Sequence, residues 1–409
     1  MRKEKRKKQT EIVRPKWIGW EIRVVVVLLA GLLWYFIYPE TLGNIEAESF
    51  FVWTPDYIGL KRSEGVAGLL SLASQFVSQF FRWREGGAFI QALLFGCVLG
   101  GMDLLWSRLH CWEASWFSWV VAGVFLCMQL RWGSLEPALT TLVVIGIIIV
   151  CLIFLLSWMR LNLPVRVLGI TNPKVRTGLS VLIVLLALVF FVVSPSAHKR
   201  EKRIAVKQAA TATAWNYVLY QITPDGASHD SILRRYALLA LAGQDQLVEN
   251  LSKFHLSSPN DFYYYLPSLP EERYFNALFY RMLGLYNEYV HQLFETGIQY
   301  SGGMTFGCLR QITDGYLKMG NVRLAKKYLT VLSCSTCHGD WVKARLALVE
   351  ALEENPIEIP EKSYMDIFIG SYPLLHEMEL LLAENPDNAK AKMYYDAARS
   401  ITSAPASVP

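Results

Sequence analysis

The stretch "ALTTLVVIGIIIVCLIFLLSW", residues 138–158, carries no charged side chain over 21 positions. A helix of about 20 apolar residues crosses the roughly 30 Å of hydrocarbon in a bilayer, so this stretch predicts a membrane-spanning helix. Similar apolar runs cover residues 24–38, 87–106, 115–130 and 179–193. Aromatic side chains, which favour the headgroup layer, stand at several of their ends. The sequence therefore predicts at least five spans and a lipid bilayer as a partner.

The composition changes at Ser194-Pro195. Residues 1–194 carry 19 basic and 12 acidic side chains, whereas residues 195–409 carry 21 and 23. The net charge of +5 thus belongs to the apolar half, which argues against nucleic acid and for a bilayer surface. We expect a basic N-terminal segment over 1–23, a transmembrane domain over 24–194, a helical domain over 195–402 and a disordered tail over 403–409.

The N-terminal segment predicts the orientation of the chain. Nine of its residues are basic, and no signal-peptidase site follows the first apolar run. Positive charge beside a span stays on the cytoplasmic side, so we expect a signal anchor with a cytoplasmic N-terminus in a bacterial inner membrane. The next loop, residues 39–64, is acidic, as suits the far side of the membrane.

The segment "GVAGLLSLASQFVSQFF", residues 65–81, has one polar and one apolar face at helical spacing. Its polar face comprises Ser71, Ser74, Gln75, Ser78 and Gln79. If the segment crosses the bilayer, the chain has six spans and its C-terminal half is cytoplasmic. If it lies in the interface, the chain has five spans and that half lies outside. The distribution of basic residues favours six spans, and the five-span arrangement stays open as the alternative.

The C-terminal half shows an internal repeat. "YRMLG" at 280–284 matches "YLKMG" at 316–320, an offset of 36 residues that is close to the 34 of tetratricopeptide repeats. In both copies the glycine is expected to end one helix before a second begins. A third copy is centred on Gly243. No alternating strand pattern of useful length is present. The sequence predicts an all-α protein, a polytopic membrane half followed by a tetratricopeptide-like array whose helix pairs bury each other's apolar faces.

Two stretches carry a family resemblance. They are "ESFFVWTPDYIGLKRSEGVAGLLSLASQFVSQFFRWREGGAFIQALL", residues 48–94, and "GYLKMGNVRLAKKYLTVL", residues 315–332. Together they resemble an uncharacterised family of bacterial multi-pass membrane proteins that end in paired helices. The resemblance implies a domain of unknown function with a C-terminal tetratricopeptide-like helical domain, and it implies no chemistry.

The turn "CSTCH", residues 334–338, has the spacing by which c-type haem is attached. A periplasmic haem or redox protein would use Cys334, Cys337 and His338. Zinc would need a fourth ligand, for which Cys308 is the candidate. The two thiols alone could be redox active, because Cys-x-x-Cys spacing lowers the pKa of a thiol. The flanking segments have the pattern of repeat helices, so we interpret the stretch as an inert turn and expect no cofactor.

Four carboxylates are candidate catalytic groups. Glu46, Glu48 and Asp56 lie in the acidic loop before the amphipathic segment, a layout that resembles the catalytic loop of polytopic glycosyltransferases. Asp103 lies near the end of an apolar run, where a charge is by default a functional hypothesis, with Arg108 or His110 as its partner.

Our main hypothesis is a membrane-anchored, non-enzymatic helical-repeat protein. Its array over residues 195–402 would present a protein- or peptide-binding surface. The alternative is a membrane transferase that acts on a lipid-linked or glycan substrate through the loop acids.

Overall fold

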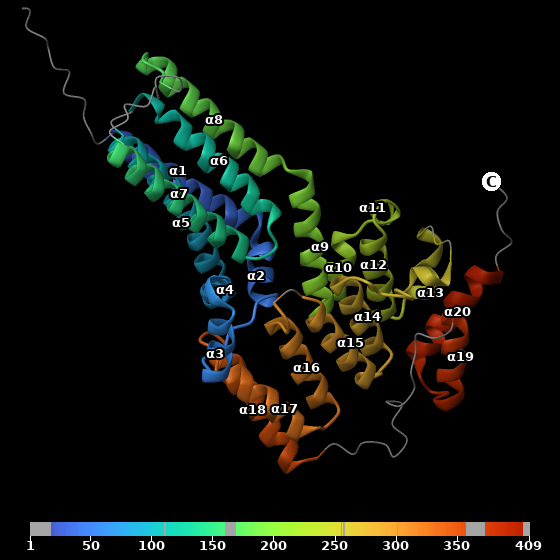
Figure 1. Ribbon diagram of the computed structural model, residues 1–409. Coiled ribbons are helices and arrows are strands. Elements are labelled where there is room, and N and C mark those ends of the chain that lie inside the picture. The colour runs from blue at the N-terminus through green and yellow to red at the C-terminus, as the bar shows by residue number, and fades with distance from the viewer. Residues whose placement is uncertain are drawn as a thin grey trace, which may run out of the picture. The chain divides into compact units, whose positions relative to one another are not determined.

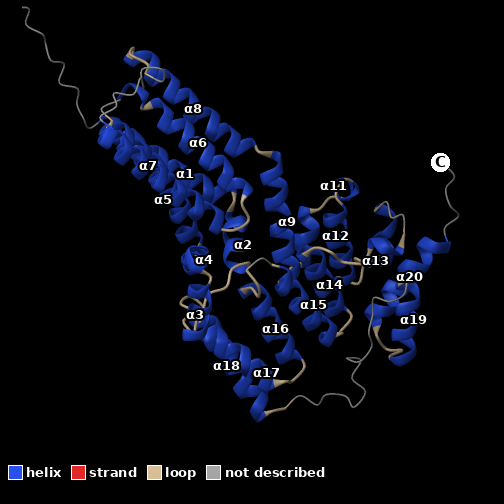
Figure 2. Cartoon of the chain, in the orientation of Figure 1, coloured by secondary structure: helices blue, strands red, loops and turns tan. Residues whose placement is uncertain are grey.

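The computed structural model describes residues 18–109, 112–159, 169–254, 256, 258–300, 302–356 and 373–403. Every regular element in these ranges is a helix, as Figure 2 shows, and the predicted all-α class is confirmed for them. The chain folds into two compact units, each built from segments that are far apart in the sequence. Figure 1 labels the helices of both. The predicted tail after Ser403 and residues 1–17 lie outside the described residues.

The first unit, here called the apolar unit, consists of residues 1–37, 88–129 and 142–192. Its helices are α1 (Ile18–Ile37), α5 (Arg84–Arg108), η2 (Trp112–Ala114), α6 (Trp116–Arg131), α7 (Glu136–Met159) and α8 (Pro173–Val193). Four of them, α1, α5, α7 and α8, are long and apolar enough to cross a membrane, and α6 is a shorter apolar helix.

Small residues bring the helices of the apolar unit close together. A Cβ atom added to Gly31 of α1 would lie 3.1 Å from the Cβ of Ala92 on α5, and one added to Gly123 of α6 would lie 3.3 Å from a carbon of α8. The amide of Gln129 donates to the side-chain oxygen of Gln91 at 2.8 Å. Close backbone approach and interhelical hydrogen bonds replace the hydrophobic effect as the source of helix association in lipid.

The second unit, here called the array unit, consists of residues 38–87, 130–141 and 193–409. From its N-terminal segment come α2 (Pro39–Ala47), α3 (Pro55–Ser63), α4 (Gly65–Ser78) and η1 (Gln79–Arg82). From its C-terminal segment come α9 (Pro195–Thr211), α10 (Trp215–Gln221), α11 (Pro224–Ser228), α12 (Ser231–Gly243), α13 (Leu247–Asn250), η4 (Leu251–Lys253), η5 (Pro259–Asp261), α14 (Pro270–Met282), α15 (Tyr286–Gln299), α16 (Phe306–Lys318), α17 (Val322–Ser333), α18 (Gly339–Glu354), α19 (Leu374–Glu384) and α20 (Ala389–Ser403).

Consecutive helices from α14 to α18 pack against one another, so each helix buries its apolar face on its neighbours. One core joins α9 to α16 with α19 and α20, and includes Phe275, Leu278 and Leu293. A second core joins α16, α17 and α18 to Phe51, which comes from the loop before α3. The array unit is therefore completed by the segment that precedes α5 in the chain.

Glycines end two helices of the array as predicted. Gly284 after α14 and Gly320 after α16 have φ of 80° and 66°, the left-handed conformation that glycine adopts at low cost. In the third copy α12 also ends at Gly243, as predicted, but the left-handed residue is Asp245, with φ 60°. A Cβ atom at Gly243 would lie 2.5 Å from the ring of Trp215, so this glycine is required by packing.

The segment 65–81 belongs to the array unit, where it forms α4 and the start of η1. Helix α4 packs against α3, and both lie before the long apolar helix α5. All five polar residues of its predicted polar face are buried.

Candidate functional site

The array unit contains a groove of about 1210 Å³. Its walls come from α2, α9, α14, α15, α16 and α18, so residues far apart in the sequence face one space. The charged side chains on the walls are Glu46, Glu48, Lys207, Arg281, Arg310, Asp314, Lys318 and Arg345. Five basic residues against three acidic ones make the groove positive.

Ion pairs hold several of these charges in fixed positions. Lys207 lies 3.3 Å from Glu48, and Arg345 makes two bonds to Asp314, at 2.7 and 3.2 Å. Burial acts to lower the pKa of Lys207, but the charge and hydrogen bond of Glu48 outweigh it and hold that pKa above its usual value. Lys207 is therefore charged at neutral pH.

Tyrosine rings line the same groove. The ammonium of Lys207 lies 4.7 Å from the ring centre of Tyr274, a cation–π distance. Tyr300 donates its hydroxyl to Glu48 at 3.2 Å, and Tyr289 donates to Gln311 at 2.7 Å. Each of these polar groups is bonded to another wall residue, which gives the groove a preorganised surface.

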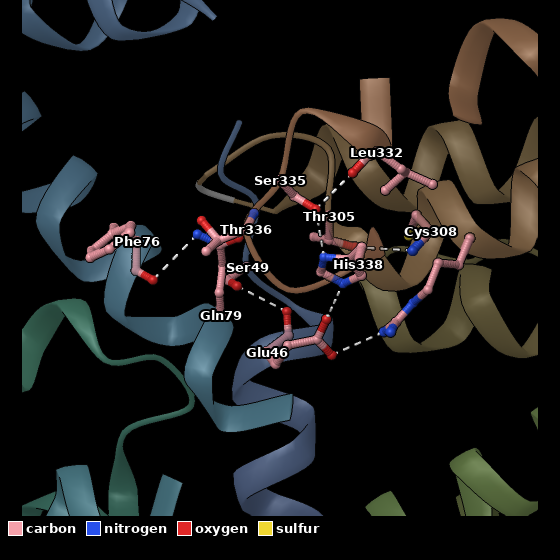
Figure 3. A network of polar contacts seen from close by, with 11 residues as sticks. Glu46, Ser49, Phe76, Gln79, Thr305, Cys308, Leu332, Ser335, Thr336 and His338 are labelled. Atoms are coloured by element: carbon pink, nitrogen blue, oxygen red, sulfur yellow. Dashed lines mark hydrogen bonds and ion pairs between the residues drawn. The ribbon is translucent and has the colours of Figure 1, made fainter. Parts of the chain in front are cut away.

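Glu46 and Arg310 of the groove wall also belong to a buried carboxylate network, drawn in Figure 3. Glu46, only 3 % exposed, comes from the last turn of α2. One of its oxygens lies 2.7 Å from Nε2 of His338, and the other accepts from Arg310 at 3.0 Å. The ring of Phe306 covers the imidazole at a centroid distance of 4.1 Å.

The environment sets the charges of this network. Burial raises the pKa of Glu46, but the bonds from His338 and Arg310 more than offset it, so that pKa lies below its ordinary value. For His338, burial lowers the pKa and Glu46 only partly restores it. At neutral pH the carboxylate is thus ionised.

Backbone hydrogen bonds explain why these residues meet. The segment after α2 runs beside the array: the carbonyl of Ser49 accepts from the amide of Phe306 at 2.8 Å. The amide of Trp53 donates to the carbonyl of Cys334 at 2.8 Å. The side chain of Gln79 accepts from the amide of Thr336 at 2.8 Å. The turn that carries the cysteines is therefore held by the loop that carries Glu46.

This geometry bears on the predicted haem and metal ligands. Both ring nitrogens of His338 are engaged, Nε2 by Glu46 and Nδ1 by Ser335 at 2.9 Å, so neither nitrogen faces an open space. Cys337 and Cys308 are buried, and burial raises the pKa of both thiols, which lowers their reactivity. Cys334 is partly exposed. Among the described residues no three metal-binding side chains cluster.

Hydrogen bonds link Ser335 to His338 and His338 to Glu46. This is the order of nucleophile, base and orienting acid in a catalytic triad. The serine hydroxyl, however, donates to the carbonyl of Leu332 at 2.7 Å, three residues back in the chain. Neither Ser335 nor His338 lines the groove. The three residues connect the end of α2 to the turn before α18.

The other candidate acids lie in three different environments. Glu48 faces the groove, whereas Asp56 is exposed in the first turn of α3 and does not line it. Asp103 pairs with Arg23 of α1 and accepts from Ser118 at 2.9 Å, all within the apolar unit. Its partner is therefore an arginine of the first apolar helix and not Arg108 as predicted, and His110 lies outside the described residues.

Sequence reasoning missed Lys207, Arg310 and Tyr300. One signal was visible: Lys207 stands alone among the apolar residues of "IAVKQAA" in a helix, where a charge needs a partner. No comparable signal marks the other two.

The fold and groove define a class: an all-helical protein with helices able to cross a membrane and a helical array that holds a charged groove. The chain belongs to the family of unknown function DUF6057, which matches residues 14–197 and 112–399 in two overlapping segments. No curated protein and no solved structure matches the chain.

Proposed function

We propose that the chain is a membrane-anchored, non-enzymatic binding protein whose tetratricopeptide-like array receives a segment of a protein or peptide in the groove. The groove itself is the observation that carries this proposal. Its volume of about 1210 Å³ exceeds the usual range of roughly 300–1,000 Å³ for small-molecule sites, which suits a longer ligand. Its fixed ion pairs and tyrosines provide a preorganised surface, which reduces the entropy lost on binding.

The state of the acids supports binding over catalysis. Both oxygens of Glu46 are bonded in a buried network, and Glu48 is bonded to Lys207 and Tyr300. A general acid or base must instead face the reacting atom within hydrogen-bond distance. Of the acids in the transferase alternative, Glu46 and Glu48 line the groove, whereas Asp56 lies elsewhere.

The charge of the groove indicates the kind of ligand. Five basic side chains against three acidic ones favour a segment that carries carboxylates. The tyrosines and the exposed Leu348 on α18 offer apolar contact beside these charges.

For the membrane arrangement we propose five spans, α1, α5, α6, α7 and α8. The three segments of the array unit are separated by pairs of apolar helices: α5 and α6 connect the first segment to the second, and α7 and α8 connect the second to the third. Two crossings return a chain to the side from which it left. One compact unit built from these segments is therefore compatible with five spans and not with a sixth at α4. With a cytoplasmic N-terminus in a bacterial inner membrane, the groove lies outside.

Two leucines of α18 provide the test. Leu348 lines the groove and is 49 % exposed, whereas Leu346 is 38 % exposed and does not line it. The full-length chain and the variants Leu348→Glu and Leu346→Glu are purified from native membranes, and the proteins recovered with each are identified. We expect a partner that accompanies the unchanged chain and Leu346→Glu but is lost with Leu348→Glu. Equal recovery with both variants would contradict the proposal.

A further inference from the structure

Helix α4 has its polarity reversed relative to a helix on a water-soluble protein. Its buried residues are Gly68, Ser71, Ser74, Gln75 and Ser78. Its exposed residues include Val66, at 75 %, and Leu69, at 50 %, together with Ala73. The exposed positions follow the spacing i, i+3 and i+7, so they form one face of the helix. The polar side chains turn inward. Of the apolar ones, Val66 and Leu69 point outward, whereas Leu72 and Phe76 pack against the second core of the array unit.

The inward polar face is satisfied by the rest of the array unit. Gln75 accepts from the hydroxyl of Tyr57 at 2.5 Å, and Ser71 donates to Glu136 at 3.3 Å. Ser78 donates to the carbonyl of Ser74 at 2.8 Å. Packing is tight on this side, because a Cβ atom at Gly68 would lie 1.9 Å from a carbonyl oxygen of α3. These contacts fix the rotation of α4, so the helix cannot turn Val66 and Leu69 inward.

The outward face is costly in water. A valine or leucine that stays exposed to water forgoes the free energy that its burial would contribute. A contiguous exposed apolar face on a helix marks a surface that is covered by something else. Lipid is the one solvent in which an apolar exterior and a polar, hydrogen-bonded interior are both favourable.

The chain itself indicates what covers this face. Helix α4 continues into η1, which ends at Arg82, and Trp83 alone separates η1 from α5. Helix α5 is one of the four helices long and apolar enough to cross a membrane. The chain thus passes from α4 to a span through one short helix and a single residue. Trp83 is exposed, and an exposed indole favours the headgroup layer.

We propose that α4 is an interfacial helix: it lies on the bilayer without crossing it, and Val66, Leu69 and Ala73 contact lipid acyl chains. This role is independent of the ligand of the groove. In this arrangement the polar face of α4, which contacts the rest of the array unit, lies on the aqueous side.

The test is photo-crosslinking of the full-length chain in its own membrane. Benzoylphenylalanine is introduced in place of Leu69 and, separately, of Val66, both exposed positions where a larger side chain fits. Ile147 on α7 serves as the lipid-facing control and Glu249, exposed on α13, as the aqueous control. Adducts are identified by mass spectrometry after irradiation.

We expect phospholipid adducts at Leu69 and Val66 in yields similar to Ile147, and none at Glu249. An adduct with a second copy of the chain or with another protein would show that a protein covers the face, and the proposal would then be wrong. An absence of adducts at both positions, while Ile147 gives one, would place the face in water and equally overturn it.

Discussion

At the scale of single residues, one carboxylate connects two distant parts of the chain. Glu46 and His338 are separated by 292 positions, yet their side chains meet at 2.7 Å in a site closed to solvent. Removing one partner of a buried ionic pair leaves the other charge uncompensated, which is why such pairs are sensitive to mutation.

We predict that Glu46→Gln lowers the free energy of unfolding of the array unit by about 3 kcal/mol, because Arg310 then loses its charged partner. The measurement is urea unfolding of the purified chain in detergent, followed by protease resistance. Asp56→Asn is the matched control: Asp56 is exposed in the first turn of α3 and its replacement is expected to cost less than about 1 kcal/mol. Equal losses for both variants would contradict the structural role of Glu46.

The same network predicts that acid destabilises the array unit. The pKa of His338 is held below its ordinary 6.5 and that of Glu46 below 4.5, so the unfolded chain binds protons more readily at both sites. The contribution of His338 to stability is fully present above pH 6.5 and is lost as the pH falls below that value through the lowered pKa of the folded state; the contribution of Glu46 is lost in the same way below pH 4.5.

The expected observation is a lower midpoint of thermal unfolding at about pH 5.5 than at about pH 7.5. In His338→Gln the difference between these two conditions should shrink, although the variant is less stable at both. A midpoint that rises on acidification would have the wrong sign for this network.

The site was only partly predictable from the sequence. In the sequence both residues are candidate site residues, but for unrelated chemistries. Glu46 is a candidate catalytic acid of a transferase, and His338 is a candidate ligand of haem. Their pairing depends on a contact across most of the chain, and no local pattern contains that information. Lys207 was detectable as a lone charge in an apolar helix, whereas its pairing with Glu48 was not.

At the scale of elements, helix ends were predicted where local chemistry decides them. Gly284 and Gly320 both have positive φ and end their helices. Gly243 also ends its helix, α12, but for another reason: its Cβ position meets Trp215, and the left-handed residue comes two positions later. An alignment of the three copies could not show which glycine is required by a left-handed conformation and which by close packing.

We predict that Gly284→Ala lowers the free energy of unfolding by about 1 kcal/mol, because a Cβ atom strains the left-handed conformation even in open space. Gly339→Ala is the control, since Gly339 also has open space around it but begins α18 without a positive φ. That change should be neutral or slightly stabilising. Similar losses in urea unfolding for the two variants would refute the conformational argument.

Helix α4 shows a second limit of pattern reading. Its 3.6-residue period and its two faces were visible in the sequence, and α4 does form within residues 65–81. Which face turns inward could not be inferred, because the usual rule that apolar residues are buried applies in water and is reversed beside lipid.

At the scale of the whole molecule, the number of spans decides the side of the groove. The apolar runs alone left five and six spans open, and the composition of the array unit supports five. We predict that tags placed before Met1 and after Pro409 are cleaved by protease from opposite sides of sealed membrane vesicles. Cleavage of both tags from the same side would require an even number of crossings and would contradict the five-span proposal.

Because the array unit is built from segments that lie between and after the apolar helices, its completion depends on the order of synthesis. Glu46 is synthesised 292 residues before His338, and in the five-span proposal four apolar helices lie between them. The array unit can therefore complete its contacts only after its last helices have been synthesised.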